Sequence, residues 1–286
     1  MVPTARPPRR SRRRPLDLWV GVLALAWVAL LVGVGSVAWP LDTVEIRLDR
    51  TFRPPGSAGA AGGAVHPLGT DQLGRDLLAR LIRGTKISVG IVLAAGLVSA
   101  VLGTGLGLAS GFAGRAIDAA VMRMVDVQIA IPFVLLILLV VAVVGASTGS
   151  LIAVLGVTGW AIYARVARAQ VLVVRELEYV QAARALGLGD GRILWRHILP
   201  NILSTQIVLL TVDLPRFVLL ESAVGFLGLG VQPPTPTLGN LIGEGRSYML
   251  LAWWLVVFPG VVIALLVVGF NLVGDWLARR GNVRVD

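Results

Sequence analysis

The sequence between Asp126 and Arg165 reads VQIAIPFVLLILLVVAVVGASTGSLIAVLGVTGWAIYA (residues 127–164), 38 residues without Asp, Glu, Lys or Arg. As one α-helix this run would be about 57 Å long, nearly twice the roughly 30 Å hydrocarbon core of a bilayer. The run therefore has to fold back, and its turn-like stretch is Gly145-Ala-Ser-Thr-Gly-Ser150. We expect two membrane-spanning helices joined at 145–150.

Composition places the whole chain in the membrane class. Hydrophobic residues make up 56% of the 286 residues, only 15% are charged, and the mean hydropathy is +0.82. Soluble domains contain about 25% charged residues. Cysteine is absent, which excludes disulfides and thiolate metal sites. The net charge of +10 does not indicate nucleic-acid binding, because the basic residues stand at the ends of apolar runs.

Further apolar runs complete an all-α, polytopic fold with six transmembrane helices. The first lies at 18–39, the second at 87–114, and the last at 247–274. The region 202–229 is also apolar but carries Asp213, Arg216 and Glu221. We predict a basic tail (1–17), an extracytoplasmic loop (40–86), a five-helix core (87–277) that includes a cytoplasmic loop (169–201), and a second tail (278–286). In the extracytoplasmic loop, an apolar stripe predicts an amphipathic helix, on the membrane surface or packed on the core: Leu73, Leu77, Leu78, Leu81 and Ile82.

Arginine placement predicts the orientation. With both termini in the cytoplasm, 17 of the 26 Lys and Arg residues lie on the cytoplasmic side, as the positive-inside rule requires. An alternative for residues 1–39 is a cleaved signal, even a twin-arginine one, ending near Ser36-Val-Ala38. The apolar run exceeds the usual 7–15 residues of a signal core, and five further spans follow, so we favour a retained helix.

The usual catalytic patterns are absent from the sequence. Gly103-Thr-Gly-Leu-Gly107 lies inside an apolar run with no strand before it, so Gly103, Gly107 and Gly111 indicate close helix packing rather than cofactor binding. His66 and His197 fall on opposite sides of the proposed membrane, and Lys86 completes no phosphate-binding loop. We predict no catalytic, cofactor-binding or metal-binding residues, and hence no enzyme activity.

The charges in 202–229 are candidate path residues. Each charge at a helix centre costs about 3 kcal/mol in the bilayer, so all three should face protein or water. Asp213 and Arg216 are three residues apart and can pair on one helix face. Glu221 is free to approach a partner. A structural ion pair is favoured over a direct role in passage, which stays open.

The cytoplasmic loop has the composition of a docking element. Residues 178–201 read EYVQAARALGLGDGRILWRHILPN, which predicts a short helix, a turn at 187–191 and a second helical stretch toward Pro200. The side chains of Ala182, Ala183 and Ala185 are small, so another protein could approach the backbone closely.

This loop resembles the EAA motif of binding-protein-dependent ABC importer permeases. That motif reads Glu-Ala-Ala, then Gly four residues later, then Ile-x-Leu-Pro ten residues beyond. The matching residues are Ala182, Ala183, Gly187, Leu199 and Pro200. Gln181 stands in the place of Glu, which removes a carboxylate available to the ATPase, and His197 stands in the place of Ile, with Ile198 one residue late.

Two further stretches resemble the second (C-type) permease subunit of dipeptide, oligopeptide and nickel importers. They are HPLGTDQLGRDLL (66–78) and ESAVGFLGLGVQPPTP (221–236), the latter continuing to Trp253-Trp254. The similarity covers residues 16–276.

The resemblance implies a type I ABC importer permease in a bacterial cytoplasmic membrane, with peptides as cargo. The implied partners are a homologous second permease, two ATP-binding subunits that hold ATP and Mg, and an extracytoplasmic binding protein. The coupling helix is expected at about 178–187, beginning with Glu178. Nickel or another small solute is an alternative cargo. An ion-coupled secondary transporter and a membrane scaffold are rival functions, which the absence of convincing repeats and the presence of a docking loop argue against.

Overall fold

The computed structural model describes residues 16–39, 43–57 and 65–281, and these form helices and loops without a β-sheet. The helices are α1 (Leu16–Ala38), α2 (Leu77–Phe112), α3 (Arg115–Ala130), α4 (Phe133–Val144), α5 (Thr148–Val174), α6 (Glu178–Ala185), α7 (Asp190–Ile193), α8 (Leu199–Phe226), α9 (Leu238–Gly245) and α10 (Trp254–Gly281). A π-helical turn, Leu194–Ile198, joins α7 to α8, and short 3₁₀ turns occur at Leu48–Arg50 and Arg246–Tyr248. The all-α fold is as predicted.

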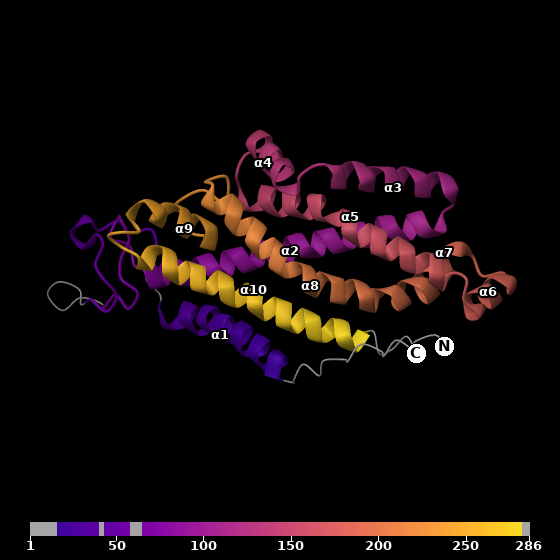
Figure 1. Cartoon of the computed structure of the whole chain (residues 1–286), viewed down its shortest axis with the longest axis horizontal. Helices are drawn as coiled ribbons and strands as arrows, with labels where there is room; N and C mark the ends of the chain where they lie inside the picture. Colours follow the sequence, from indigo (N-terminus) through magenta and orange to yellow (C-terminus); the bar gives the residue numbers. More distant parts are fainter. Residues whose placement is uncertain (1–15, 40–42, 58–64, 282–286) are drawn as a thin grey trace, which may run out of the picture.

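The long helices lie roughly along one axis, and two small assemblies occupy its ends (Figure 1). The segment 43–76 and α9 lie at one end, which we call the α9 end. Helix α6 lies at the other, the α6 end (Figure 1). The first turn of α1 and the last turns of α10 point toward the α6 end.

Helices α2 and α5 form the centre of the bundle. Gly103, Gly107 and Gly111, which we call the glycine ladder, lie at the contact between α2 and α5, so the predicted close helix packing is confirmed. A Cβ atom on Gly107 would be 2.5 Å from the carbonyl oxygen of Ala164 and 2.6 Å from the Cβ of Ala167, and one on Gly111 would be 2.7 Å from Val171. Only glycine permits this separation of the two helices. Ser99 also donates a 2.7 Å hydrogen bond across the contact to the carbonyl of Gly156.

The predicted turn at 145–150 is confirmed. Gly145 ends α4 with a φ of 88°, and Ser147 and Ser150 form a capping box that begins α5. The sequence did not predict a second break before it. Helices α3 and α4 meet at Ile131-Pro132 with a bend of 92°, because a proline disfavours helical backbone at the residue before it.

Four helices in the described part of the chain are long and apolar enough to cross a membrane: α1, α2, α5 and α10. The bent pair α3–α4 makes a fifth candidate. Helix α8 has 28 residues, enough to span about 42 Å, although it carries three charged residues. Counting both gives the six expected spans.

Three predicted boundaries are wrong. Helix α2 begins at Leu77 rather than at residue 87, so most of the expected amphipathic helix is the first part of α2. Leu77, Leu81 and Ile82 are buried, which selects packing on the core over a position on the membrane surface. Helix α5 continues to Val174, so the loop that was predicted to begin at residue 169 begins at Arg175. Helix α10 begins at Trp254, because 247–253 form turns.

Candidate functional site

Helix α6 carries the EAA-like sequence and ends in a glycine cap. The N–H of Leu188 donates to the carbonyl of Ala183 and the N–H of Gly187 donates to that of Arg184, a Schellman pattern. Gly187 has a φ of 80°, which disfavours any side chain, although a Cβ there would meet no atom within 4 Å. Gly187 therefore sets the direction of the chain after α6.

One face of α6 is buried and the other is exposed. Val180 and Ala183 pack into an apolar cluster with Leu108 of α2, Val171 of α5 and Ile202 of α8. The exposed face presents the candidate residues Glu178, Gln181 and Ala182, together with Arg184 and Ala185. Of the remaining candidates, Leu199 is partly buried and packs against the cluster, while Pro200 is exposed.

The side chain of Gln181 donates two hydrogen bonds that an ionised glutamate could not donate. Its side-chain amide donates to the carbonyl of Arg175 at 3.1 Å and to the carboxylate of Glu176 at 3.4 Å. A glutamate at 181 would have no donor for the carbonyl and would bring a second negative charge beside Glu176. The departure from the motif is therefore locally consistent.

Three contacts, none of them anticipated from the sequence, tie the loop to the long helices. Tyr179 of α6 accepts a 2.6 Å hydrogen bond from Asn201 of α8. Arg175 donates at 2.9 Å to the carbonyl of Gly111 near the end of α2, and the guanidinium of Arg184 lies 5.8 Å from the ring centre of Phe112. A displacement of α6 would thus act on α2 and α8 together.

The second helical stretch predicted toward Pro200 is present, and it runs without interruption into α8. The Leu199 N–H donates to the Leu194 carbonyl, five residues back, within the π-helical turn. Pro200, which has no N–H to donate, directly follows this wide turn at the second position of α8. Such wide turns are frequent at functional sites.

The α6 end exposes large apolar side chains beside α6. Leu186 is 81% exposed and Trp195 is 69% exposed, and Leu177 and Tyr179 are also accessible. Large exposed apolar side chains of this kind are candidates for contact with another protein. We call these four side chains together with the exposed face of α6 the α6 surface.

The predicted pair of Asp213 and Arg216 is present in α8. Arg216 donates from Nε to one carboxylate oxygen of Asp213 at 2.7 Å and from a terminal nitrogen to the other at 2.8 Å. Tyr163 of α5 donates to the same carboxylate at 3.1 Å, and the Arg216 guanidinium lies 5.0 Å from the ring centre of Phe133 on α4. Asp213 is thus fully partnered between helices.

Glu221 lies further along α8 and is 1% exposed. It accepts hydrogen bonds from Ser88 of α2 at 3.1 Å and from Ser222 at 3.5 Å. The Ser88 hydroxyl in turn accepts from the backbone N–H of Leu238, the first residue of α9. Glu221 therefore joins α2, α8 and α9 and is separate from the Asp213–Arg216 pair.

The two other motif stretches meet at the α9 end. His66 contacts Asp76 at 2.7 Å, and Asp76 caps α2 by accepting from the N–H of Ala79. Arg80, which is 1% exposed, bridges Asp71 of the first stretch at 2.6 Å and Glu244 of α9 at 3.0 Å. Sequence reasoning assigned no role to these residues, because Arg80 and Glu244 are 164 positions apart.

The described residues thus form an all-helical bundle with several helices able to cross a membrane and one small helix, α6, at one end. The model of the family described as binding-protein-dependent transport system inner membrane component matches residues 103–285. The chain belongs to this family and is a multi-pass inner-membrane protein.

Named relatives agree with this assignment. The chain is 37% identical to the dipeptide transport system permease protein DppC of Haemophilus influenzae, over 90% of this chain and 87% of that protein. It is 36% identical to the glutathione transport system permease protein GsiD of Pectobacterium atrosepticum, over 95% and 89% of the two chains. An inward-facing structure of the MetNI methionine ABC transporter aligns with a TM-score of 0.56 at 20% identity, over 71% of this chain and 96% of that one, which supports the fold.

Proposed function

We propose that this chain is a permease subunit of an ATP-driven peptide importer, and that an ATPase subunit binds the α6 surface. The observation that carries the proposal is the combination of small, exposed residues on α6 with direct contacts from α6 to α2 and α8. An external subunit can approach the backbone of Ala182 and Ala185 closely, and its movement is passed to the bundle.

The coupling residues of the proposal are those of the EAA-like loop: Glu178, Gln181, Ala182, Ala183, Gly187, Leu199 and Pro200. In this proposal the chain itself binds no nucleotide and catalyses no reaction. ATP and Mg are bound by two partner ATPase subunits, a homologous second permease completes the translocation path, and an extracytoplasmic binding protein delivers the cargo.

The proposed orientation places the α6 end in the cytoplasm. Helix α1 begins and helix α10 finishes on that side of the bundle (Figure 1), so both termini are cytoplasmic. Arg279 and Arg280 stand in the last turn of α10, and the positive-inside rule places such residues in the cytoplasm. The α9 end then faces the binding protein.

Small peptides are the proposed cargo class. Relatives named for dipeptides and for glutathione match at nearly equal identity, 37% and 36%, and glutathione is itself a tripeptide. The intramembrane residues Asp213, Arg216 and Glu221 are all held by internal partners, which favours a structural role over direct cargo contact.

Cysteine cross-linking tests both the docking surface and the orientation. The chain has no cysteine, so single substitutions give no background. Leu186→Cys on the α6 surface should cross-link to an ATPase subunit in membranes, whereas Leu250→Cys, which is fully exposed at the α9 end, should not. An impermeant maleimide added to whole cells, with the outer membrane permeabilised where one is present, should label Leu250→Cys only. Labelling of Leu186→Cys instead would overturn the orientation, and failure to cross-link would overturn the docking assignment.

A further inference from the structure

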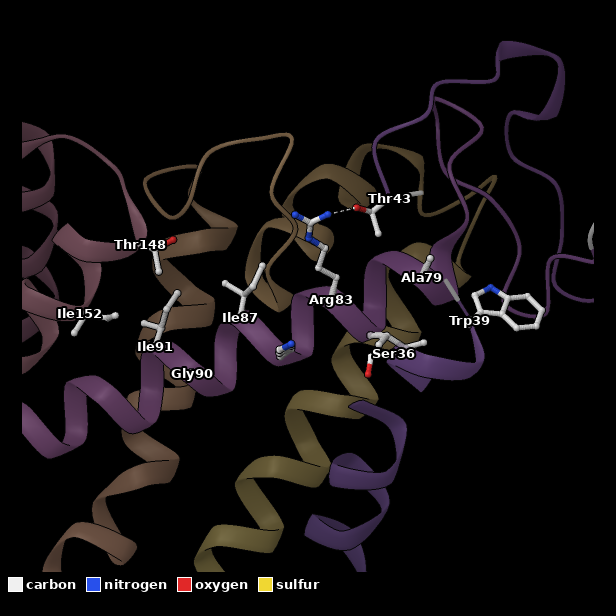
Figure 2. Close-up of a pocket in the computed structure, with 12 residues that line it drawn as sticks. Ser36, Trp39, Thr43, Ala79, Arg83, Ile87, Gly90, Ile91, Thr148 and Ile152 are labelled. Carbon is white, nitrogen blue, oxygen red and sulfur yellow. Dashed lines mark hydrogen bonds between the residues drawn. The ribbon is translucent and has the colours of Figure 1, made fainter. Parts of the chain in front are cut away.

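An open cavity of about 740 Å³ lies along α2 toward the α9 end (Figure 2). Residues of α2 form its floor. Ser36 of α1 and Trp39 just after it line one side, and Thr148 and Ile152 at the beginning of α5 line the other. The sequence analysis predicted no ligand-binding role for any residue of this cavity, and neither the α6 surface nor the intramembrane ion pair includes one.

The cavity is polar at one end and apolar at the other. Arg83 points toward Thr43 and donates to its hydroxyl at 2.9 Å (Figure 2). Ile87 and Ile91 follow Arg83 on the same face of α2, at successive turns, and Ile152 lies opposite. From Arg83 to Ile91 the helix rises about 12 Å. A ligand that fills the cavity must therefore have a polar head and an apolar body.

The polar end is positively charged. Arg83 and Lys86 both line the cavity, and among the described residues no Asp or Glu does. Within the described part of the chain, neither of them forms an ion pair. Trp39 stands where α1 ends, the depth at which tryptophan side chains meet lipid headgroups. The head of the ligand should therefore be an anion at the membrane interface.

We propose that this cavity binds one anionic phospholipid, with the phosphate between Arg83 and Lys86 and an acyl chain over Ile87 and Ile91. A soluble anion would use the two cations but has no need of the apolar floor, and a zwitterionic lipid would bring a quaternary ammonium group close to the two cations. The inference requires only that the chain spans a membrane, so it is independent of the proposed function.

Native mass spectrometry of the full chain, extracted in mild detergent with the subunits that copurify, tests the headgroup. One dioleoyl phosphatidylglycerol should be retained in preference to dioleoyl phosphatidylcholine. The double variant Arg83→Gln/Lys86→Gln should weaken this retention about 25-fold, about fivefold for each cation. Arg47→Gln, which removes an exposed cation from the same end of the molecule, should change nothing. Equal retention of the two lipids would overturn the proposal.

A second variant tests the acyl-chain floor. Gly90 lines the cavity and a Cβ on it would meet no atom within 4 Å, so Gly90→Leu should fill the cavity while keeping both cations and the helix. It should abolish phosphatidylglycerol retention. Gly105→Leu, equally unobstructed but outside the cavity, is the control.

Two further outcomes would overturn the proposal. Retention that is displaced by millimolar glycerol 3-phosphate and survives Gly90→Leu would show a soluble-anion site and overturn the lipid. Phosphatidylglycerol binding that appears only in Asp42→Asn would show that Asp42, which lies outside the described residues, neutralises the cations, and would also overturn the proposal.

Discussion

The phenolic oxygen of Tyr179 on α6 accepts a 2.6 Å hydrogen bond from the side-chain amide of Asn201 on α8. Asn201 also donates to the carbonyl of His197 in the π-helical turn. One amide thus joins the proposed coupling helix, the π-helical turn and the first turn of a long helix. Because these three elements follow one another in the chain, the bond closes a loop and makes it move as a unit.

Tyr179→Phe removes this hydrogen bond and keeps the ring. A hydrogen bond of this kind contributes about 1 kcal/mol, so transport-coupled ATP hydrolysis in proteoliposomes should fall about fivefold. Asn201→Leu should have a similar effect. Hydrolysis by the double variant should be no lower than hydrolysis by the less active of the two single variants. Additive losses would mean that the two residues act separately.

Gly187→Val should uncouple the loop without preventing insertion. The residue has a φ of 80°, which costs a β-branched side chain about 2 kcal/mol, so α6 would lose its cap. Stimulated ATP hydrolysis should fall at least about tenfold. The control is Gly189→Val, because Gly189 has a φ of −64° and an equally open surrounding. Equal activity of the two variants would contradict the role given to Gly187.

Neutralising the ion pair in α8 distinguishes a structural role from a path role. Arg216→Gln leaves Asp213 buried with only Tyr163 as a partner, which should cost about 3 kcal/mol and lower the thermal stability in detergent. The double variant Asp213→Asn/Arg216→Gln restores neutrality and should recover both stability and transport. A stable double variant that does not transport would place the pair on the substrate path.

Gly107→Leu should separate α2 from α5. Its side chain would begin 2.5 Å from a backbone oxygen of Ala164, a clash that rotation of a side chain cannot relieve, and overpacking of this kind costs about 3 kcal/mol. Thermal aggregation in detergent should occur at a clearly lower temperature than in the wild type. Gly105→Leu, two residues away and unobstructed, should not shift it.

Much of this architecture could be predicted from local sequence. The turn at 145–150 follows from two glycines and two serines inside an overlong apolar run. The glycine ladder follows from a spacing of four residues, and the Asp213–Arg216 pair from a spacing of three. In each case the deciding residues lie within one or two helical turns, where helix periodicity alone fixes their neighbours.

The remaining features depend on contacts between distant residues. Helix α2 continues through Arg80 because Glu244 of α9 and Asp71 neutralise that arginine. A prediction based on uncharged residues alone starts the helix only after the last charged residue, and so it misses this part of α2. The Tyr179–Asn201 bond requires the path through the π-helical turn, whose wide turn carries no local signal. The proposed ATPase-coupling role of the loop rests on its resemblance to the EAA motif, since its composition alone indicates only docking.

The continuity of α2 has a mechanical consequence. This helix begins in the ion cluster at the α9 end and runs without interruption for 36 residues, about 54 Å, to the carbonyl that Arg175 holds beside α6. The glycine ladder fixes α5 against its second half. If α2 rotates as a rigid body about its contact with α5, a displacement of one end of α2 moves the other end in the opposite direction. Under the proposed function, movement of α6 and movement at the α9 end would be opposite ends of one rotation of α2, with no relay of intermediate contacts between them.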